Sequence, residues 1–526
     1  MTKDFMYKSL RMMMAAACML AVYGCKTRQA VTSPVVDKSI VVIYDNDVHC
    51  GIDGYARMAG LRDAVRDTAW AALVSSGDFL QGGTAGAISK GQYIVDIMKQ
   101  MGYDAVTLGN HEFDYGVPRM QELLGGANLP VTCANFFANG SLTPAYAPYI
   151  MKQYGVKKVA FVGAVTTTAL YTEAYAFYDD KGAPIYHLSE KDVYQHIQNA
   201  ANDARKAGAD YVVVISHLGE SANVLNCDSH GLVAATRGID VVLDGHTHSV
   251  IECDYVENLD GRKIPVTQTG TKFENVGKLV IDKHGNITPH LVPLKDITAE
   301  NARVKATTDS INAQMKELTM RPICHNDYEL NILDAQGRQQ VRYAETNSGD
   351  IVTDAYLSVS GADVAITNGG GIRDGLKSGD LTYGDILGML PYDNYLNVVE
   401  VTGAELLDVL EACCQFTPVE NGDFPQSAGM TYCINKSSQP RVIDLRILDK
   451  KSGEYMPVDL SRKYQLVTID YCITGGGLQN KLRNAKIVKE NMCRYNDALI
   501  TYVTETLGGK IPERYAKPQG RIVIKE

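Results

Sequence analysis

The sequence predicts an α/β protein, with an N-terminal domain built on sheet strands covered on both faces and a second domain after it. Short runs rich in Val, Ile and Leu alternate with helix-like stretches in the N-terminal half, and this alternation is typical of sheet strands that are covered on both faces. Five of these runs are each followed directly by a cluster of Asp, His or Asn. The chain has 526 residues, which is more than one hydrophobic core usually organises, so two domains are expected.

The predicted strands end where the polar clusters begin. The strands are expected at Ser39–Tyr44, Ala71–Ser75, Asp104–Leu108, Tyr211–Ile215 and Ile239–Leu243. The clusters read D-x-H (Asp47, His49), S-G-D (Asp78), G-N-H-E-x-D (Asn110, His111, Asp114), S-H (His217) and D-G-H-T-H (His246, His248). Ligands of α/β sheets bind beyond the carboxyl ends of the strands, so these side chains are expected to meet at one rim.

Seven of these side chains form a candidate binding site for two divalent metal ions. They are Asp47, His49, Asp78, Asn110, His217, His246 and His248. Carboxylate, imidazole and amide ligands without a thiolate leave Zn, Mn, Co and Fe as candidates. Seven ligands serve two metals if one of them bridges, and Asp78 is the natural bridge because a carboxylate has two oxygens. Two metals about 3.5–4 Å apart hold a hydroxide and clamp the attacking and leaving oxygens of a displacement.

His111 is left out of this ligand set because Asp114 follows it by three residues. If the stretch turns helically, that spacing lets the carboxylate orient the imidazole. An imidazole held in this way stabilises charge on phosphoryl oxygens or protonates a leaving group. His111 and Asp114 are therefore a hypothetical catalytic dyad.

Charge and the N-terminus indicate partners and location. A net charge of −10 argues against binding of nucleic-acid polymers, because proteins that bind them have basic surfaces. A small anionic substrate stays compatible because bound metals reverse the local sign of the charge.

The N-terminus resembles a targeting segment. Basic residues precede an apolar run at Met12–Val22, as in a signal peptide. The ending V-Y-G-C resembles a bacterial lipobox, so residues 1–24 are expected to be removed, Cys25 lipidated and residues 25–38 to act as a tether. Cleavage by an ordinary signal peptidase is the alternative, since Tyr23 is bulky. The expected location is the bacterial cell envelope, with the lipid anchor in a bilayer.

The cysteines and the region near residue 300 give weaker signals. Export would permit a disulfide between Cys227 and Cys253, although each cysteine is individually predicted to be a small buried apolar residue. Thr298 is predicted to cap a helix from about Ala299 to Leu318, which Pro322 ends.

The ordered N-terminal motifs together resemble the calcineurin-like metallophosphoesterases. The stretch N-G-G-G-I-R at Asn368–Arg373 narrows the resemblance to the 5′-nucleotidase family, which includes UDP-sugar hydrolases and 2′,3′-cyclic-nucleotide phosphodiesterases. The resemblance runs from about Ile40 almost to the C-terminus. It implies a four-layer α/β/β/α catalytic sandwich (residues 39–298), a linker helix (299–321) and an α+β substrate-binding domain (322–526). It also implies one metal held by Asp47, His49, Asp78 and His248, and another held by Asp78, Asn110, His217 and His246.

The substrate-binding candidates lie in the C-terminal part. Glycines allow a backbone to approach a ligand closely and an Arg fork suits phosphate, so Asn368, Gly370 and Arg373 are candidates. By the resemblance, Tyr392 and Tyr471 fall where relatives place two aromatic residues that sandwich a base.

Three departures from the family pattern leave the substrate open. Relatives often carry a nucleotide-binding Arg shortly before the motif that corresponds to Asn347–Asp354, and the sequence indicates that this Arg is missing here. Within the motif, Asp350 replaces an Asn. Gly477 stands where relatives have an acidic residue, and Tyr replaces Phe at both aromatic positions.

The expected function is removal of phosphate from nucleoside 5′-monophosphates by attack of the hydroxide held between the metals. The alternative keeps the same metal site but cleaves 2′,3′-cyclic nucleotides, as a phosphodiesterase and 3′-nucleotidase, or UDP-sugars. A non-catalytic binding protein would be expected to have lost some of the metal-binding residues, and all seven are present. The sequence does not indicate an oligomeric state.

Overall fold

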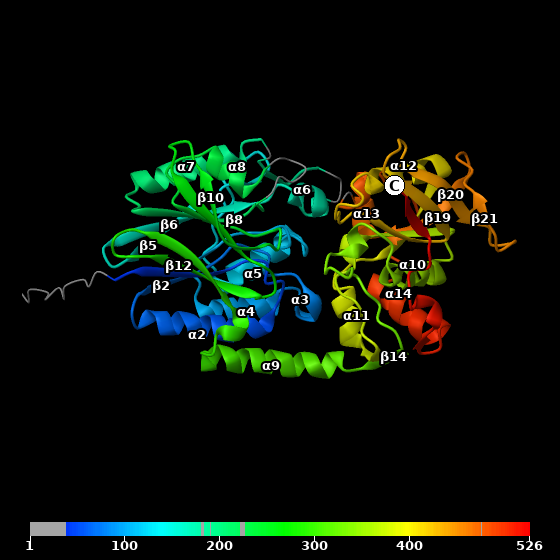
Figure 1. Ribbon diagram of the computed structural model, residues 1–526, viewed down its shortest axis with the longest axis horizontal. Coiled ribbons are helices and arrows are strands. Elements are labelled where there is room, and N and C mark those ends of the chain that lie inside the picture. The colour runs from blue at the N-terminus through cyan, green and yellow to red at the C-terminus, as the bar shows by residue number, and fades with distance from the viewer. Residues whose placement is uncertain (1–37, 180–182, 190, 221–226, 475, 526) are drawn as a thin grey trace, which may run out of the picture. The chain divides into compact units, whose positions relative to one another are not determined.

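The computed structural model describes residues 38–179, 183–189, 191–220, 227–474 and 476–525 (Figure 1). The predicted signal segment, the predicted lipidation site at Cys25 and all but the last residue of the predicted tether lie outside these residues. None of the helices in the described part is both long and apolar enough to cross a bilayer.

The first sheet carries three of the five predicted strands. Its order is β13-β12-β1-β2-β3. The bounds are β1 (Ile40–Asp45), β2 (Trp70–Ser75), β3 (Ala105–Val106), β12 (Asn275–Ile281) and β13 (Ile287–Pro293). Strands β1, β2 and β3 run parallel, so their carboxyl ends lie at the same edge. One face packs against α2 (Tyr55–Arg66), α4 (Gln92–Met101) and α5 (Val117–Ala127) (Figure 1).

The second sheet carries the other two predicted strands. Its order is β10-β11-β9-β8-β6-β5. The bounds are β5 (Tyr149–Tyr154), β6 (Lys157–Val165), β8 (Tyr211–His217), β9 (Val241–Leu243), β10 (Val250–Glu257) and β11 (Lys263–Thr269). Helices α7 (Val193–Lys206) and α8 (Ser229–Ala234) cover its outer face (Figure 1).

Side-chain alternation along β1 shows how the two sheets stack. Val42 and Tyr44 belong to a buried cluster that also contains Phe161 of the second sheet, whereas Val41 and Ile43 belong to the cluster on the helical side. Successive side chains of a strand point to opposite faces, so β1 is buried on both faces, as its continuous apolar sequence predicts. The four-layer α/β/β/α arrangement is confirmed.

The helix predicted to begin at Ala299 begins later. Helix α9 spans Ala302–Thr319, and its N-cap is Asn301, whose side chain accepts a hydrogen bond from Val304 N at 3.0 Å. The prediction of Thr298 as the cap was therefore wrong. Asn is at least as good an N-cap as Thr, and the Asn301 N–H also donates to Ala56 O of α2 at 2.9 Å, which fixes the start of the helix. The helix ends before Pro322, where β14 begins.

The C-terminal part forms three sheets and a separate hydrophobic core. The sheet orders are β18-β15-β22-β17-β23, β16-β14-β24 and β21-β20-β19-β25. The strands are β14 (Pro322–Asn326), β15 (Val364–Asn368), β16 (Gly379–Thr382), β17 (Leu396–Thr402), β18 (Pro425–Ala428), β19 (Met430–Asn435), β20 (Val442–Leu448), β21 (Tyr455–Pro457), β22 (Lys463–Ile469), β23 (Lys486–Lys489), β24 (Lys510–Ile511) and β25 (Ile522–Lys525). The main helices are α10 (Asn347–Ser360), α11 (Tyr383–Met389), α12 (Gly403–Cys414), α13 (Asp470–Thr474) and α14 (Tyr495–Thr501). All buried members of this core lie between Cys324 and Ile522.

Cys227 and Cys253 are not joined to each other. Cys253 lies on β10, and Cys227 precedes α8. Most of the other described cysteines are buried, in agreement with the expectation that they fill small apolar spaces.

Candidate metal centre and substrate pocket

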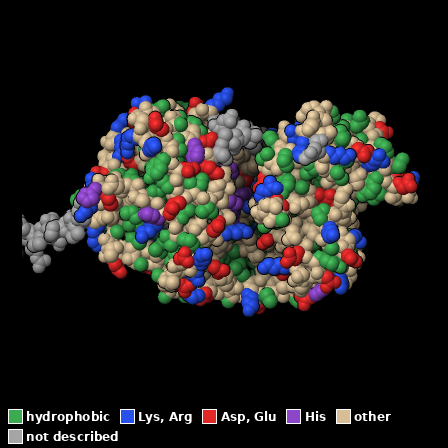
Figure 2. All heavy atoms as spheres, in the orientation of Figure 1, with side chains coloured by type: hydrophobic (Ala, Val, Ile, Leu, Met, Phe, Trp, Pro, Cys, Tyr) green, Lys and Arg blue, Asp and Glu red, His purple; other side chains and the backbone are tan. Residues whose placement is uncertain are grey.

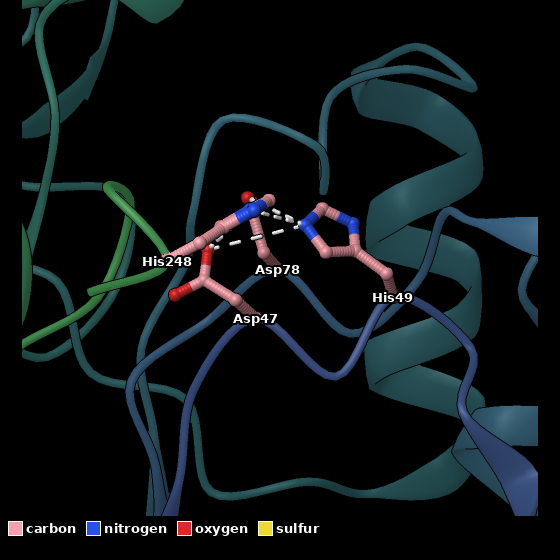
Figure 3. Close-up of side chains that lie close together, drawn as sticks. All are labelled: Asp47, His49, Asp78 and His248. Atoms are coloured by element: carbon pink, nitrogen blue, oxygen red, sulfur yellow. Dashed lines mark hydrogen bonds and ion pairs between the residues drawn. The ribbon is translucent and has the colours of Figure 1, made fainter. Parts of the chain in front are cut away.

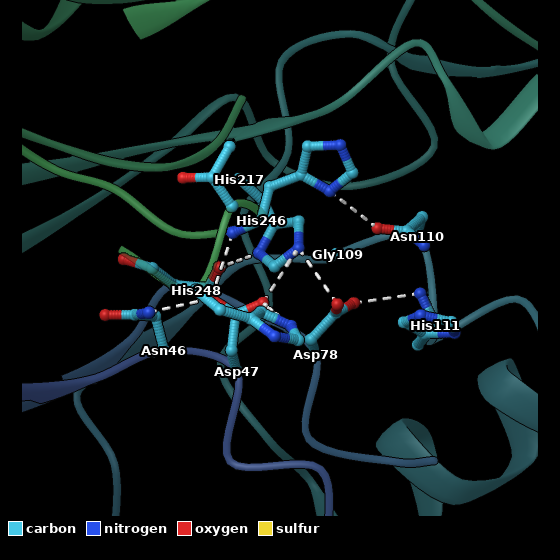
Figure 4. Close-up of polar contacts among 12 residues, drawn as sticks. Asn46, Asp47, Asp78, Gly109, Asn110, His111, His217, His246 and His248 are labelled. Atoms are coloured by element: carbon cyan, nitrogen blue, oxygen red, sulfur yellow. Dashed lines mark hydrogen bonds and ion pairs between the residues drawn. The ribbon is translucent and has the colours of Figure 1, made fainter. Parts of the chain in front are cut away.

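Five loops bring the predicted ligands together at the edge where the strands end. Asp47 and His49 follow β1, Asp78 follows β2, Asn110 follows β3, His217 ends β8, and His246 and His248 follow β9. Figure 4 shows six of these side chains close together: Asp47, Asp78, Asn110, His217, His246 and His248. The convergence of all seven side chains is what a site beyond the carboxyl ends of strands requires.

The first cluster consists of Asp47, His49, Asp78 and His248. One ligand atom from each lies within 4.8 Å of the others, and Figure 3 shows the four side chains pointing toward one another. The Nε2 atoms of His49 and His248 are 3.0 Å apart. His248 Nε2 is 3.4 Å from Asp47 Oδ1, and His49 Nε2 is 3.8 Å from Asp78 Oδ2.

The second cluster shares Asp78 with the first. His217 Nε2 lies 3.1 Å from Asp78 Oδ2, and His246 Nδ1 lies 3.0 Å from Asn110 Oδ1. The rings of His217 and His246 meet edge to face with centroids 5.3 Å apart. Asp78 thus lies between the two clusters, at the place that a bridging ligand would occupy.

The histidine tautomers fit a bound cation. His49 Nδ1 lies 3.2 Å from Gln81 O, and His217 Nδ1 lies 2.7 Å from Ser76 O. A carbonyl oxygen only accepts hydrogen bonds, so Nδ1 carries a hydrogen, and Nε2, which lies on the side of the carboxylates, is the ring atom left to bind a metal. Within the described residues, the buried atoms His217 Nε2 and Asp47 Oδ1 make no hydrogen bond of good geometry. Their polar neighbours are other predicted ligand atoms: Asp78 Oδ2 lies 3.1 Å from His217 Nε2, and His248 Nε2 lies 3.4 Å from Asp47 Oδ1. A divalent metal would satisfy both atoms, so the residues present fit such an ion.

Electrostatics inside the cluster also favour a cation. Burial lowers the pKa of His217, but the Asp78 and Asp47 carboxylates outweigh it and raise that pKa to about 10. Burial raises the pKa of Asp47, but His217 and His248 lower it to about 2. Carboxylates buried this deeply need positive charge beside them.

The ligand loops have an unusual backbone. Left-handed φ values occur at Asp47 (51°), His49 (44°), Asp78 (57°), His246 (86°) and His248 (59°). This conformation is uncommon for residues other than Gly, although Asn, Asp and His adopt it more often than most, and it persists where the surrounding structure enforces it, often at functional sites. Gly109 is required for a different reason, lack of space: a Cβ there would lie 2.2 Å from Asp78 Oδ1.

Glu112 holds the loop that presents Asp78, and the sequence reasoning assigned it no role. The side chain is fully buried and accepts four backbone N–H bonds, from Asp78 (2.7 Å), Phe79 (2.8 Å), Leu80 (3.0 Å) and Gly109 (2.6 Å). Burial and the nearby Asp78 raise the pKa of Glu112 to about 7. Its position inside the motif G-N-H-E-x-D was the available signal.

His111 and Asp114 contact each other as their spacing predicts. His111 Nδ1 lies 2.8 Å from Asp114 Oδ2, and the turn between them is closed by a bond from Phe113 N to Asn110 O at 3.1 Å. His111 also donates its backbone N–H to Asp78 Oδ1 at 2.8 Å. Burial lowers the pKa of His111, but Asp114 and Asp78 outweigh it and raise that pKa well above its usual value.

A pocket of about 660 Å³ opens over the clusters. Asp78, Asn110, His246 and His248 line one side, while Asp47, His49 and His217 lie buried beneath it. The five predicted substrate-binding residues line the other side: Asn368, Gly370, Arg373, Tyr392 and Tyr471. In Figure 2, histidine side chains are visible inside a hollow of the surface, with charged side chains on its rim.

The two tyrosines are held differently. The Tyr392 ring lies nearly parallel to His111, with centroids 6.3 Å apart and an interplanar angle of 29°. The Tyr471 ring lies against Gly476 and Gly477, where an added Cβ would be 2.5 Å and 2.7 Å from ring carbons. The ring therefore occupies the space that a side chain at Gly477 would need, which accounts for glycine at this position.

Arg342 corrects one sequence expectation. No arginine was expected to serve the substrate before Asn347–Asp354, yet Arg342, in the short turn η4 (Gln340–Arg342), lines the pocket. Burial and the charge of Arg373 lower the pKa of Arg342 to about 10, so it stays cationic. Asp350 lies elsewhere, with Oδ1 3.6 Å from Arg521 Nε, and that departure does not reach the pocket.

Comparisons with known proteins agree with this geometry. The pattern of the calcineurin-like phosphoesterases matches residues 42–250, and that of the 5′-nucleotidase C-terminal domain matches residues 328–483. The chain is 27% identical over 534 residues to the trifunctional nucleotide phosphoesterase protein YfkN of Bacillus subtilis, across 92% of this chain but only 35% of that protein. It is 26% identical to the 5′-nucleotidase of Rattus norvegicus, across 86% of this chain and 81% of the relative.

Among solved structures, the 5′-nucleotidase precursor from Thermus thermophilus superposes with a TM-score of 0.78 and 24% identity, covering 92% of this chain and 99% of that one. Fold and sequence patterns together define a metal-dependent phosphoester hydrolase. Within that class, the chain belongs to the 5′-nucleotidase family.

Proposed function

We propose that this protein removes phosphate from nucleoside 5′-monophosphates with the help of two divalent metal ions. The supporting observation is the pocket, which has the His, Asp and Asn side chains on one side and Arg342, Arg373, Tyr392 and Tyr471 on the other. A substrate with a phosphate at one end and a flat base at the other matches both sides.

Each metal would have four protein ligands, with Asp78 shared. One metal would be held by Asp47, His49, Asp78 and His248, and the other by Asp78, Asn110, His217 and His246. Zn, Mn, Co and Fe all suit this donor set. When bound, such a pair of ions activates the water that attacks phosphorus and neutralises charge on the reacting oxygens.

The chain's own residues would orient the phosphate and stabilise its charge. His111, oriented by Asp114 through the 2.8 Å contact, would donate from its ring to a phosphoryl oxygen or to the leaving oxygen. The Arg373 fork would bind the phosphate, and Arg342 would add positive charge on the same wall. Tyr392 and Tyr471 would stack on the base, and Asn368 and the backbone at Gly370 would fix its orientation.

We further propose that the protein is exported and held at the bacterial cell envelope by a lipid on Cys25. The support is the sequence of residues 1–25, with a basic start, an apolar run and the ending V-Y-G-C. Cys25→Ser should abolish incorporation of labelled fatty acid and release the protein from the membrane fraction. Unchanged labelling of that variant would contradict lipidation at this cysteine.

The substrate proposal is tested by phosphate release from a soluble protein beginning at Lys26. The substrates are AMP, UMP, 2′,3′-cyclic AMP, UDP-glucose and an aryl phosphate, supplied with Mn or Zn, with EDTA as the control. The cyclic nucleotide and UDP-glucose are run with and without an added phosphatase. We expect rapid release from AMP or UMP that EDTA abolishes. Turnover of only the cyclic nucleotide or UDP-glucose would overturn the monophosphate proposal and favour the alternative substrates at the same metal site.

A further inference from the structure

Glu173 is a buried carboxylate beside the metal centre that the mechanism above does not use. It follows the short helix α6 (Ala169–Thr172), is 3% exposed and lies against the pocket. No strand-end motif contains it, and the chain brings it to the site from the segment after β6.

Glu173 contacts a predicted metal ligand directly. Its Oε1 accepts a hydrogen bond from Asn110 Nδ2 at 3.3 Å, and its Oε2 accepts one from Thr172 Oγ1 at 2.5 Å. The other end of the same amide, Asn110 Oδ1, lies 3.0 Å from His246 Nδ1. Asn110 is therefore held between Glu173 and the metal-facing edge of His246.

The direction of this amide matters because its two ends have different chemistry. Asn offers a carbonyl oxygen with lone pairs and an NH₂ group that only donates, so only Oδ1 can ligate a metal. A rotation of 180° about χ2 would place Asn110 Oδ1 against the Glu173 carboxylate and turn NH₂ toward the metals. A carboxylate that accepts from Nδ2 opposes that rotation.

The same segment supports the second ligand of this metal. Thr168 Oγ1 lies 3.4 Å from His246 Nε2 and 2.8 Å from Thr166 Oγ1. A hydrogen on His246 Nε2 shared with this hydroxyl leaves the Nδ1 lone pair facing Asn110 Oδ1 and the metal side. Backbone bonds from Glu173 N to Ala169 O (3.0 Å) and from Ala176 N to Glu173 O (2.9 Å) fix the segment.

We infer that Glu173 is a positioning residue, which fixes the carboxamide of Asn110 so that Oδ1 faces the metal that Asn110 and His246 would share. This inference rests on the proposed two-metal function. It assigns Glu173 an effect on one metal and not on the metal of Asp47, His49 and His248.

The test is titration of Mn²⁺ or Zn²⁺ into metal-free protein, followed by calorimetry and by metal analysis after dialysis, with no substrate present. The wild type should bind two ions per chain. Glu173→Leu should weaken one of them by about 10–100-fold, the usual cost of losing a partner of a metal ligand, and leave the other unchanged. Glu345→Gln, which alters a buried carboxylate outside the pocket, is a control for the loss of a buried negative charge, matched to Glu173→Gln, and should bind both ions normally.

A double-variant cycle tests whether Glu173 acts through Asn110. In an Asn110→Ala background, Glu173→Leu should cause no further loss of affinity. An equal further loss, or unchanged affinity for both ions in Glu173→Leu, would overturn the inference.

Should Glu173→Leu fail to fold, Glu173→Gln is the deciding variant, because its amide can also donate a hydrogen bond to a flipped Asn110. Lower affinity for one ion in Glu173→Gln supports the inference, and wild-type affinity for both ions overturns it. Fewer than two ions in the wild type would overturn the metal assignment itself, which is a separate result.

Discussion

The proposed metal-ligand loops and the opposite wall of the pocket, where we propose that the substrate binds, are built in different ways. The ligand loops follow strands directly, and five of their residues have left-handed backbone; Glu112 holds one of these, Asp78, through its backbone N–H. The wall is assembled from separate segments, at Arg342, Asn368–Arg373, Tyr392 and Tyr471. The ligand loops hold the reacting groups in fixed positions. Residues of the wall can be replaced, with a change in the substrate bound, without moving the ligand loops. Changes in the ligand loops should therefore lower turnover of every substrate, and changes in the wall should discriminate between substrates.

The largest effect is expected at Asp78, which contacts both clusters. Asp78→Asn should reduce turnover of all substrates by roughly 10³-fold or more, because several kcal/mol of charge stabilisation by the metals are lost. Metal analysis should show fewer than two ions per chain. Two retained ions with near-normal turnover would remove Asp78 from the bridging position.

Substitution of His111 should separate the effect on turnover from the effect on metal binding. His111→Ala should keep both metals while turnover falls by about 10²–10⁴-fold, since a charged donor to the phosphate is lost. Metal analysis and phosphate release on the same samples check this. Loss of a metal in this variant would make His111 a ligand and contradict the dyad.

Substitution of Tyr471 should change substrate binding at the pocket wall and leave the ligand loops unaffected. Tyr471→Ala should raise KM for AMP by about 5–150-fold, corresponding to about 1–3 kcal/mol of base stacking, while kcat/KM for a small aryl phosphate changes little. The comparison uses initial rates on both substrates. Equal losses on AMP and on the aryl phosphate would exclude a stacking role.

The smallest effect is expected at Asp350, which departs from the family pattern but lies outside the pocket. Burial raises its pKa from 3.8 to about 8, although Arg521 opposes the shift, and Glu345 adds to it. The folded state therefore holds a proton that the unfolded state releases between these values, so this contribution to stability is complete below about pH 3.8 and is lost as pH rises through about 8.

Asp350→Asn imitates the protonated acid, so its Tm relative to wild type should increase between pH 6 and pH 9, by an amount on the order of a few degrees. Thermal unfolding of both proteins across that range measures the difference, and kcat/KM for AMP should be unchanged. A constant Tm difference would contradict the raised pKa, and a large change in KM would give Asp350 a substrate role.

The sequence predicted the ligand loops better than the wall for a physical reason. Asp47, His49, Asp78, His217 and His248 each stand within a few residues of a strand end, so strand direction alone places them at one edge. Arg342 was missed because its place in the pocket depends on how the turn η4 packs against the loop after β15. Glu173 was missed because it comes from the segment after β6 and meets Asn110 only through tertiary packing. The cap of α9 was misplaced by three residues because Asn301 has a partner on α2 that the local pattern does not reveal.

By itself, the sequence determined the family, the layered fold and the set of side chains around Asp78, because short motifs at strand ends carry both the backbone geometry and the chemistry. The tertiary structure decided which atoms face one another: the Nε2 atoms of His49 and His217 toward the carboxylates, the orientation of Asn110, the inclusion of Arg342 in the pocket and the packing of Tyr471 on Gly477. These depend on hydrogen bonds and contacts between residues far apart in the chain, and no local pattern encodes them.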